Sequence, residues 1–173
     1  GGCVRDMILG KIPDDYDVTT NALPEEIKSV FSDLKTIDTG IKHGTVTVIK
    51  NSFHIEVTTY RIDGEYKDNR RPESVTFSKK LADDLSRRDF TVNALAYHPD
   101  KGIIDYLDGV NDLKNKCIKF INDPRISINE DPIRLIRGLR FSLTLGFIVD
   151  DNDYKVMQQE AYRVSTLGKI RLD

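Results

Sequence analysis

The sequence has 173 residues, of which 39% are hydrophobic and 31% charged, and its formal net charge is −2. This composition is that of an ordinary globular protein and excludes a disordered, collagen-like or disulfide-rich chain. The near-neutral charge excludes a global basic field, so any nucleic-acid contact must come from local basic patches. No apolar run reaches membrane length, and two isolated cysteines, Cys3 and Cys117, predict a reducing, cytoplasmic location.

The first stretch, Gly1 to Gly10, predicts a short helix that opens on a pair of glycines. A glycine pair at a helix start lets a phosphate approach backbone N–H groups, where the helix dipole favours negative charge. Arg5 is expected to point away from the apolar side and toward that phosphate; the alternative is an ordinary surface arginine. The abrupt start without Met predicts a fragment that lacks a preceding strand.

Two carboxylates follow, Asp15 and Asp17, in a predicted strand. Side chains of a strand alternate, so both fall on one face. Two carboxylates near a phosphate cradle are typical of a Mg²⁺-nucleotide site. The alternatives are a solvated loop and a Ca²⁺ loop, although the EF-hand pattern is only half met: Glu26 stands at the twelfth position, but Thr20 stands where glycine is needed.

A helix and a hairpin come next in the chain. Pro24 and the acidic residues after it predict a helix over residues 23–31. Alternating β-branched residues predict strands over 45–49 and 53–60, joined by a turn at 50–52.

Glu56 lies on the second strand of this hairpin. If Ile55 and Val57 face the helical layer, as Tyr16 and Val18 are expected to do, Glu56 lies on the open face with the two aspartates. It would then supply a third carboxylate to the cation site. The alternative is a solvent-facing strand charge.

A polar stretch follows over residues 61–77 and predicts a functional loop. Asp89 predicts the cap of a short helix over residues 90–96. Arg87 and Arg88 stand at the entrance of that helix, where an anion would be favoured. The alternative is a solvated cluster of charges.

A long helix is predicted from Asn129 onward, with Pro132 near its start. An apolar stripe is expected on one side of it, formed by Leu135, Ile136, Leu139 and Leu143.

On a different side of the predicted helix lie Asp131, Arg134 and Arg137. One interpretation is a solvated ion-pair face. The other is an edge that reads bases: cytosine and adenine both offer an amino donor beside a ring-nitrogen acceptor, which suits an Asp and an Arg. Guanine and uracil present the reverse polarity and would leave both side chains unpaired.

Several segments in order resemble the class II tRNA nucleotidyltransferases, the CCA-adding enzymes. They are residues 1–6, 15–17, 43–46, 56–61, 84–94 and 130–141. The resemblance implies an α/β (α+β) fold: a polymerase-β-like nucleotidyltransferase head over residues 1–124, with a mostly antiparallel or mixed sheet flanked by helices, followed by the start of an all-helical neck over 125–173. It also implies addition of C, C and A to the tRNA 3′ end from CTP and ATP, with release of pyrophosphate and use of Mg²⁺, two ions being expected.

The same resemblance implies roles for individual residues. It assigns the metal ions to Asp15 and Asp17, the third carboxylate to Glu56, the incoming nucleotide to Gly2, Arg5 and Arg88, the base template to Asp131 and Arg134, and further nucleotide contacts to Arg137 and Arg140. It also identifies residues 61–77 with the loop tied to the switch from C to A. Within the superfamily, a poly(A) polymerase or an enzyme adding only CC or only A remains open. From other classes, the alternatives are a metal-dependent phosphohydrolase and a catalytically silent RNA-binding module.

Overall fold

The computed structural model describes residues 1–64, 66, 72 and 74–167. Its helices are α1 (Gly2–Ile8), α2 (Pro24–Val30), α3 (Leu81–Ser86), α4 (Gly109–Lys114), α5 (Pro124–Glu130), α6 (Ile133–Leu145) and α7 (Asp151–Gln159), with 3₁₀ turns η1 (Ile41–His43), η2 (Thr91–Asn93) and η3 (Ala161–Thr166). Its strands are β1 (Asp17–Thr20), β2 (Lys35–Ile37), β3 (Thr45–Lys50), β4 (Phe53–Thr59), β5 (Arg61–Asp63), β6 (Val75–Phe77), β7 (Leu95–His98), β8 (Gly102–Asp105), β9 (Cys117–Ile118) and β10 (Ile148–Val149).

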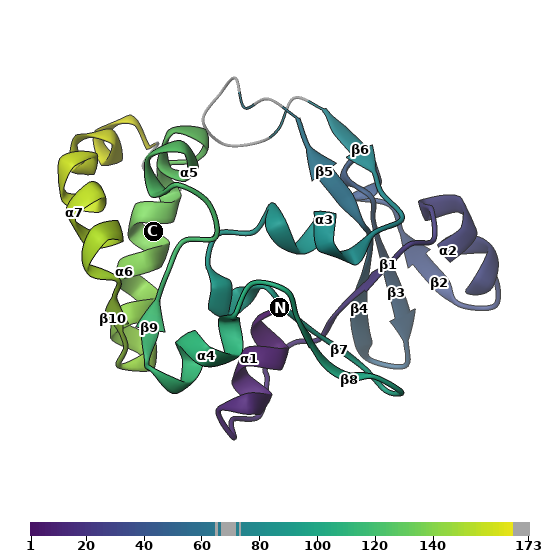
Figure 1. Ribbon diagram of the computed structural model, residues 1–173. Helices are drawn as coiled ribbons and strands as arrows, with labels where there is room; N and C mark the ends of the chain where they lie inside the picture. Colours follow the sequence, from purple (N-terminus) through teal and green to yellow (C-terminus); the bar gives the residue numbers. More distant parts are fainter. Residues whose placement is uncertain (65, 67–71, 73, 168–173) are drawn as a thin grey trace.

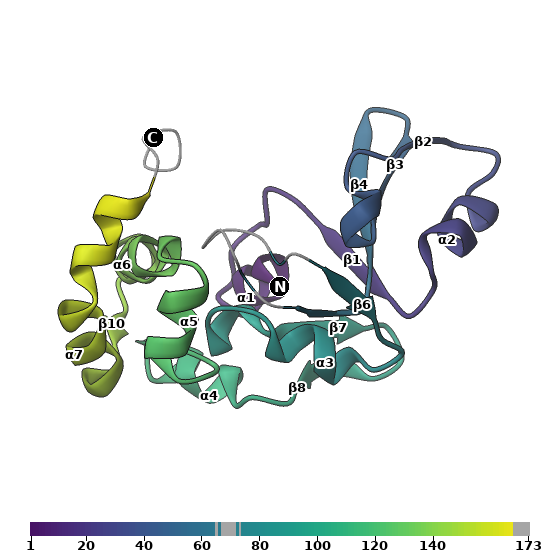
Figure 2. The same ribbon diagram turned by 90° about the horizontal axis from the view of Figure 1, so that it is seen from above.

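The molecule has a sheet with α2 at one end and the helices α5, α6 and α7 at the other (Figure 1). Between them lie α1, α3 and the β7–β8 hairpin, an arrangement that the view from above repeats (Figure 2). The sheet at one end of the molecule and the helices at the other therefore both face this middle region.

The main sheet is mixed, with strand order β1-β4-β3-β2. β1 runs parallel to β4, and the other neighbours are antiparallel. The predicted hairpin is confirmed, because Lys50 pairs with Phe53 and Thr45 with Thr58. Alternation along these strands buries one side against α2, where a small core forms from Ile27, Val46, Val48 and Val57.

A second hydrophobic core lies between the middle region and the helices α5, α6 and α7. Its fully buried side chains include Phe90, Leu95, Ile118 and Ile128. The Phe90 ring packs on Phe120 with centroids 4.7 Å apart. The same core takes in members of α1, α4, α6 and α7, so the glycine-opened helix and the helical end share one hydrophobic interior.

The predicted helix from Asn129 is wrong in its start. The structure has two helices there: α5 ends at Glu130, and α6 begins at Ile133. Between them Asp131 is extended, with φ −148° and ψ 102°. The residue before a proline is driven out of the helical region, and Pro132 therefore separates the helices.

The predicted apolar stripe of α6 is also wrong in part, since Leu139 is 43% and Leu143 is 83% exposed. The buried side is centred on Gly138, because a Cβ there would lie 3.2 Å from both Phe90 Cζ and Met157 Cε. The missing side chain lets α6 approach the core closely. The other buried members of α6 are Arg134, Leu135 and Phe141.

Three further expectations differ from the structure. Residues 61–77 contain the paired strands β5 and β6, and most of the intervening predicted loop lies outside the described residues. The predicted helix over 90–96 is instead η2 followed by β7. The C-terminal part is not all-helical, because β10 pairs in parallel with β9. Across the described ranges, no helix combines the length and apolar character needed to cross a membrane.

Candidate active site

A cleft of about 1020 Å³ opens between the main sheet, the start of α1, the end of α3 and the start of α6. Every site residue expected from the sequence lines it except Arg140. Those that line it are Gly2, Arg5, Asp15, Asp17, Glu56, Arg88, Asp131, Arg134 and Arg137. Arg140 is exposed on α6 outside this lining, and the roles expected of all these residues stay predictions.

The acidic wall of the cleft comes from the β1–β4 edge of the sheet. Asp17 pairs in register with Glu56, so the two carboxylates share the face opposite the α2 core. Asp15 precedes the strand rather than belonging to it, yet it lines the same cleft. Tyr16, expected against the helical layer, is 56% exposed and also lines the cleft.

Carboxylate oxygens are the ligands that Mg²⁺ prefers, and Asp15, Asp17 and Glu56 are all exposed to the cleft. In the part of the chain that the structure describes, no group of three or more His, Cys, Asp or Glu side chains is placed to hold a metal ion. Mg²⁺ commonly takes one or two carboxylates and completes its shell with water and substrate phosphates. The donor set therefore fits a cation that arrives with a triphosphate.

Arg5 lies in α1 beside the glycine pair and does not behave as a free surface arginine. Its side chain is only 11% exposed. Two of its nitrogens donate to Asp6, at 2.8 and 2.9 Å, and Nη1 donates to Asn93 Oδ1 at 2.7 Å. The guanidinium is therefore held at the cleft wall.

Asp84, which the sequence reasoning missed, organises the arginine pair at the end of α3. Its side chain is fully buried. It accepts hydrogen bonds from Arg87 Nε at 3.0 Å, Arg87 Nη2 at 2.8 Å, Arg88 Nη2 at 3.4 Å and Thr19 Oγ1 at 3.4 Å. The available signal was the spacing of three and four residues from the aspartate to the arginines, which places all three on one helical side.

Asp131 and Arg134, which the sequence analysis predicts to read the base, lie where α5 ends and α6 begins. Asp131 Oδ1 accepts from the Ile133 backbone N–H at 3.1 Å and so caps α6. Arg134 is 8% exposed; its Nη1 donates to Glu130 Oε2 at 2.8 Å and to the Ser127 carbonyl at 3.2 Å. Both side chains line the cleft. Asp131 is held by its bond to the start of α6, and Arg134 by its bonds to the last part of α5.

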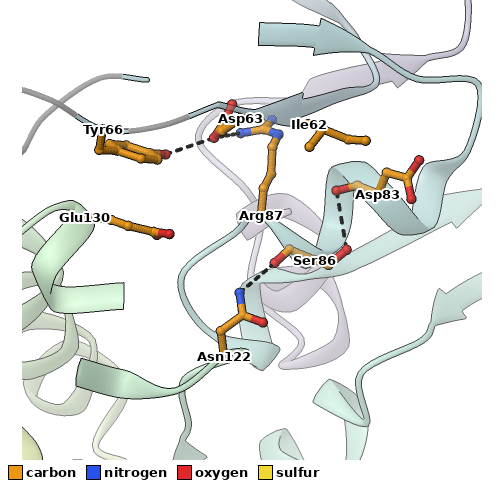
Figure 3. A pocket seen from close by; sticks show the side chains of 8 residues that line it. All are labelled: Ile62, Asp63, Tyr66, Asp83, Ser86, Arg87, Asn122 and Glu130. Atoms are coloured by element: carbon orange, nitrogen blue, oxygen red, sulfur yellow. Dashed lines mark hydrogen bonds and ion pairs between the residues drawn. The ribbon is translucent and has the colours of Figure 1, made fainter. Parts of the chain in front are cut away.

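A smaller hollow of about 310 Å³ adjoins the cleft through Arg87, which lines both. In Figure 3 the Tyr66 hydroxyl points at Asp63, to which it donates at 3.0 Å. Burial, together with the nearby Asp63 charge, raises the pKa of Tyr66 to about 12, still further above neutral pH than its ordinary value of 10. The ring of Tyr66 also lies 5.9 Å from the guanidinium carbon of Arg134.

This combination is typical of a nucleotide-transferring head domain: a sheet edge that presents carboxylates, a glycine-opened helix, and arginines across a shared cleft. The profile of the poly A polymerase head domain matches residues 1–119, and the chain belongs to that family.

The relatives that match nearly the whole chain share one name. The sequence is 48% identical to the CCA-adding enzyme of Leuconostoc citreum (strain KM20) and 47% identical to that of Limosilactobacillus fermentum, each over 99% of this chain and 42% of the relative. The structure is similar to that of the Bacillus stearothermophilus CCA-adding enzyme in complex with CTP, with 37% identity and a TM-score of 0.86 over 97% of this chain and 40% of that chain. It also resembles a tRNA nucleotidyltransferase complexed with a primer tRNA and an incoming ATP analog, with 28% identity and a TM-score of 0.76 over 99% of this chain and 49% of that chain. The chain thus spans less than half the length of these relatives.

Proposed function

We propose that this chain carries the catalytic centre of a CCA-adding enzyme, which transfers C, C and A from CTP and ATP to the 3′ end of tRNA and releases pyrophosphate. The observation that carries the proposal is that Asp15 and Asp17 line the same cleft as Asp131 and Arg134. A cation site and a base-reading edge on one cleft are what untemplated, base-selective nucleotide transfer requires. The names of the relatives support the same activity.

In this proposal Asp15 and Asp17 hold Mg²⁺, with two ions expected, and Glu56 is the third carboxylate. When bound, the metal would lower the pKa of the RNA 3′-hydroxyl and offset charge on the departing pyrophosphate. The chain's own contribution is positioning. Backbone N–H groups at Gly2 and the guanidiniums of Arg5 and Arg88 receive the triphosphate, and their fixed positive charge stabilises the charge that develops during transfer.

Base choice falls to Asp131 and Arg134. The carboxylate accepts from the amino group of cytosine or adenine, and the guanidinium donates to the adjacent ring nitrogen. Arg134 is already ordered by Glu130, so a base with the reverse polarity would face fixed groups that cannot turn to meet it. Selection of C and A by the same contacts follows.

The test uses the complete enzyme and a tRNA that lacks its CCA end, with CTP alone, ATP alone and both together. The proposal expects two added residues with CTP, three with both, and no addition with ATP alone. Gel analysis of product length at single-nucleotide resolution gives the answer. A tRNA that is extended neither by CTP alone nor by CTP and ATP together would overturn the proposal.

A second candidate, a poly(A) polymerase, is favoured by the description of the matching family. It predicts a long A tail with ATP alone in the same assay. An enzyme that adds only CC or only A would stop short of the complete end. A metal-dependent phosphohydrolase would release inorganic phosphate from nucleotides without RNA, which a phosphate assay on the same samples detects.

A further inference from the structure

Asn93, which ends the turn η2, connects two arginines of the cleft lining that come from different helices, Arg5 from α1 and Arg137 from α6. Arg5 Nη1 donates to Asn93 Oδ1 at 2.7 Å. Asn93 Nδ2 donates to Asp89 Oδ1 at 3.2 Å, and Arg137 Nε donates to Asp89 Oδ2 at 2.6 Å. An unbroken chain of hydrogen bonds therefore runs from α1 through η2 to α6.

The middle position of this hydrogen-bond chain, residue 93, suits a side-chain amide. Arg5 Nη1 donates toward position 93, and Asp89 Oδ1, which also accepts from the Phe90 backbone N–H at 2.8 Å, accepts from it; a neutral side-chain amide can serve both partners. The partners also fix which way the amide faces, because the reversed orientation would put its NH₂ against a guanidinium and its oxygen against a carboxylate. Asn93 is only 7% exposed, so neither partner is readily replaced by bulk water.

A shared aromatic ring brings the two arginines close together. The guanidinium carbons of Arg5 and Arg137 lie 5.2 and 5.4 Å from the centroid of the Phe141 ring. Arg140 lies 5.2 Å from the same centroid, and the like charges of these guanidiniums repel each other, a repulsion that anions and dipoles between them offset. Asp89 and Asn93 occupy that intermediate position in the hydrogen-bond chain.

We propose that Asn93 is a positioning residue that orders Arg5 directly and Arg137 through Asp89, so that both guanidiniums are set before a nucleoside triphosphate enters. This deepens the proposed function and rests on it, because the nucleotide is the ligand that the two arginines are to receive. Asn93 acts through its neighbours and not on the reacting atoms. Pre-ordering of this kind lowers the entropic cost of binding and acts mainly on nucleotide affinity.

The experiment compares Asn93→Ala and Asn93→Asp in the complete enzyme, with Asn111→Ala as the matched control. Asn111 is exposed in α4, and among the described contacts its side-chain amide bonds only to Asp108. One readout is the NMR signal of the Arg5 and Arg137 Nε–H groups, which reports guanidinium order without any turnover. The other is kcat and KM for CTP and ATP.

Asn93→Ala is expected to broaden or shift both arginine signals and to raise KM about 10-fold for both nucleotides, with kcat changed less than about 3-fold. Asn93→Asp keeps the acceptor but faces Asp89 with a second carboxylate, so it should retain the Arg5 signal and disturb that of Arg137. If the alanine variant does not fold, the aspartate variant alone decides. Arginine signals and KM values equal to those of Asn111→Ala would overturn the proposal. If the wild-type enzyme adds no nucleotides, the proposed function fails, while the arginine signals still decide whether Asn93 orders the pair.

Discussion

The two walls of the cleft present functional groups in different ways. On the sheet side, Asp15, Asp17 and Glu56 are exposed, and the β1–β4 register sets where the last two stand. On the helical side, Arg134 and Arg137 are held by ion pairs to Glu130 and Asp89. The backbone positions the acids, whereas side-chain partners position the arginines.

This difference suits the two tasks that the proposed function gives to the cleft. A cation site must be open, since the ion arrives with phosphates and exchanges water during turnover. A base-reading edge must be fixed, because discrimination depends on groups that cannot adapt to the wrong base. Variants on each wall should therefore fail in different ways.

Asp17→Asn removes a charge from the sheet wall and should have the largest effect. An amide does not replace a carboxylate as a ligand for a divalent cation, so we expect kcat to fall by about 10²–10³-fold or more. Asp17 is exposed, so the thermal unfolding midpoint should be unchanged. The matched control is Asp14→Asn, an exposed neighbour outside the cleft lining, which should keep full activity. Substantial turnover by Asp17→Asn would refute the assignment to the metal.

Asp131→Ala removes the acceptor from the helical wall. Discrimination of CTP over UTP should fall by about 10- to 100-fold, corresponding to one lost base contact, in single-nucleotide incorporation assays. The alanine also removes the cap of α6, which costs about 1 kcal/mol of stability. Asp131→Asn separates the two effects, since it keeps a capping oxygen but alters the base edge. An unchanged preference in both variants would count against the template role.

Gly138→Val tests the packing that holds the helical wall. The added side chain would meet Phe90 and Met157, where a Cβ alone already approaches to 3.2 Å. Overpacking of this kind costs about 1–3 kcal/mol, visible as a lowered midpoint in thermal or urea unfolding. Leu143→Ala on the same helix is the control and should leave the midpoint unchanged, because Leu143 is 83% exposed. A lowered midpoint for Leu143→Ala and an unchanged one for Gly138→Val would mean that the apolar stripe predicted from the sequence is the buried side after all.

Asp153→Asn should give the smallest effect, and it depends on pH. Asp153 accepts from the Phe120 N–H at 2.7 Å, and burial raises the pKa of its carboxyl above the ordinary 3.8. The folded state therefore binds the proton more tightly than the unfolded state, so this group lowers stability as pH rises through its raised pKa. Asparagine keeps the acceptor without the charge. We expect a small gain in stability at pH 7 that disappears below about pH 4.

A matched control for the pH series is Asp151→Asn, an exposed carboxylate on the same helix. It should show no such pH-dependent gain. A loss of stability in Asp153→Asn at pH 7 would mean that the ionised hydrogen bond to Phe120 outweighs the desolvation of the charge.

The sheet was largely predictable from the sequence because the alternation that specifies each strand lies within a few consecutive residues. Alternating β-branched residues fix the hairpin, and the same alternation correctly puts Glu56 on the face of Asp17. The expectation failed at the strand start, where Asp15 and Tyr16 lie outside β1, and at Val18, which is 46% exposed and lines the cleft. Strand ends are set by which backbone groups find partners, and β4 offers β1 a partner from Asp17 onward.

The helical wall was less predictable because its determinants are distant in sequence or are not apolar. Hydrophobic periodicity identifies the buried side of a helix from its large apolar residues, but α6 packs most closely on the core at Gly138. The break at Asp131 had a local signal in the proline that follows it. Asn93 has no such signal, since the arginines that it connects, Arg5 directly and Arg137 through Asp89, are far apart in the sequence and only the fold brings them together.

The most direct test of the account is a crystal structure of the complete enzyme with a non-reactive CTP analogue and Mn²⁺, whose anomalous signal locates the metal. The account predicts Mn²⁺ within coordination distance of Asp15 and Asp17, bridged to the triphosphate, with the cytosine edge paired to Asp131 and Arg134. A metal bound away from these carboxylates, or a base turned from the Asp131–Arg134 edge, would contradict it.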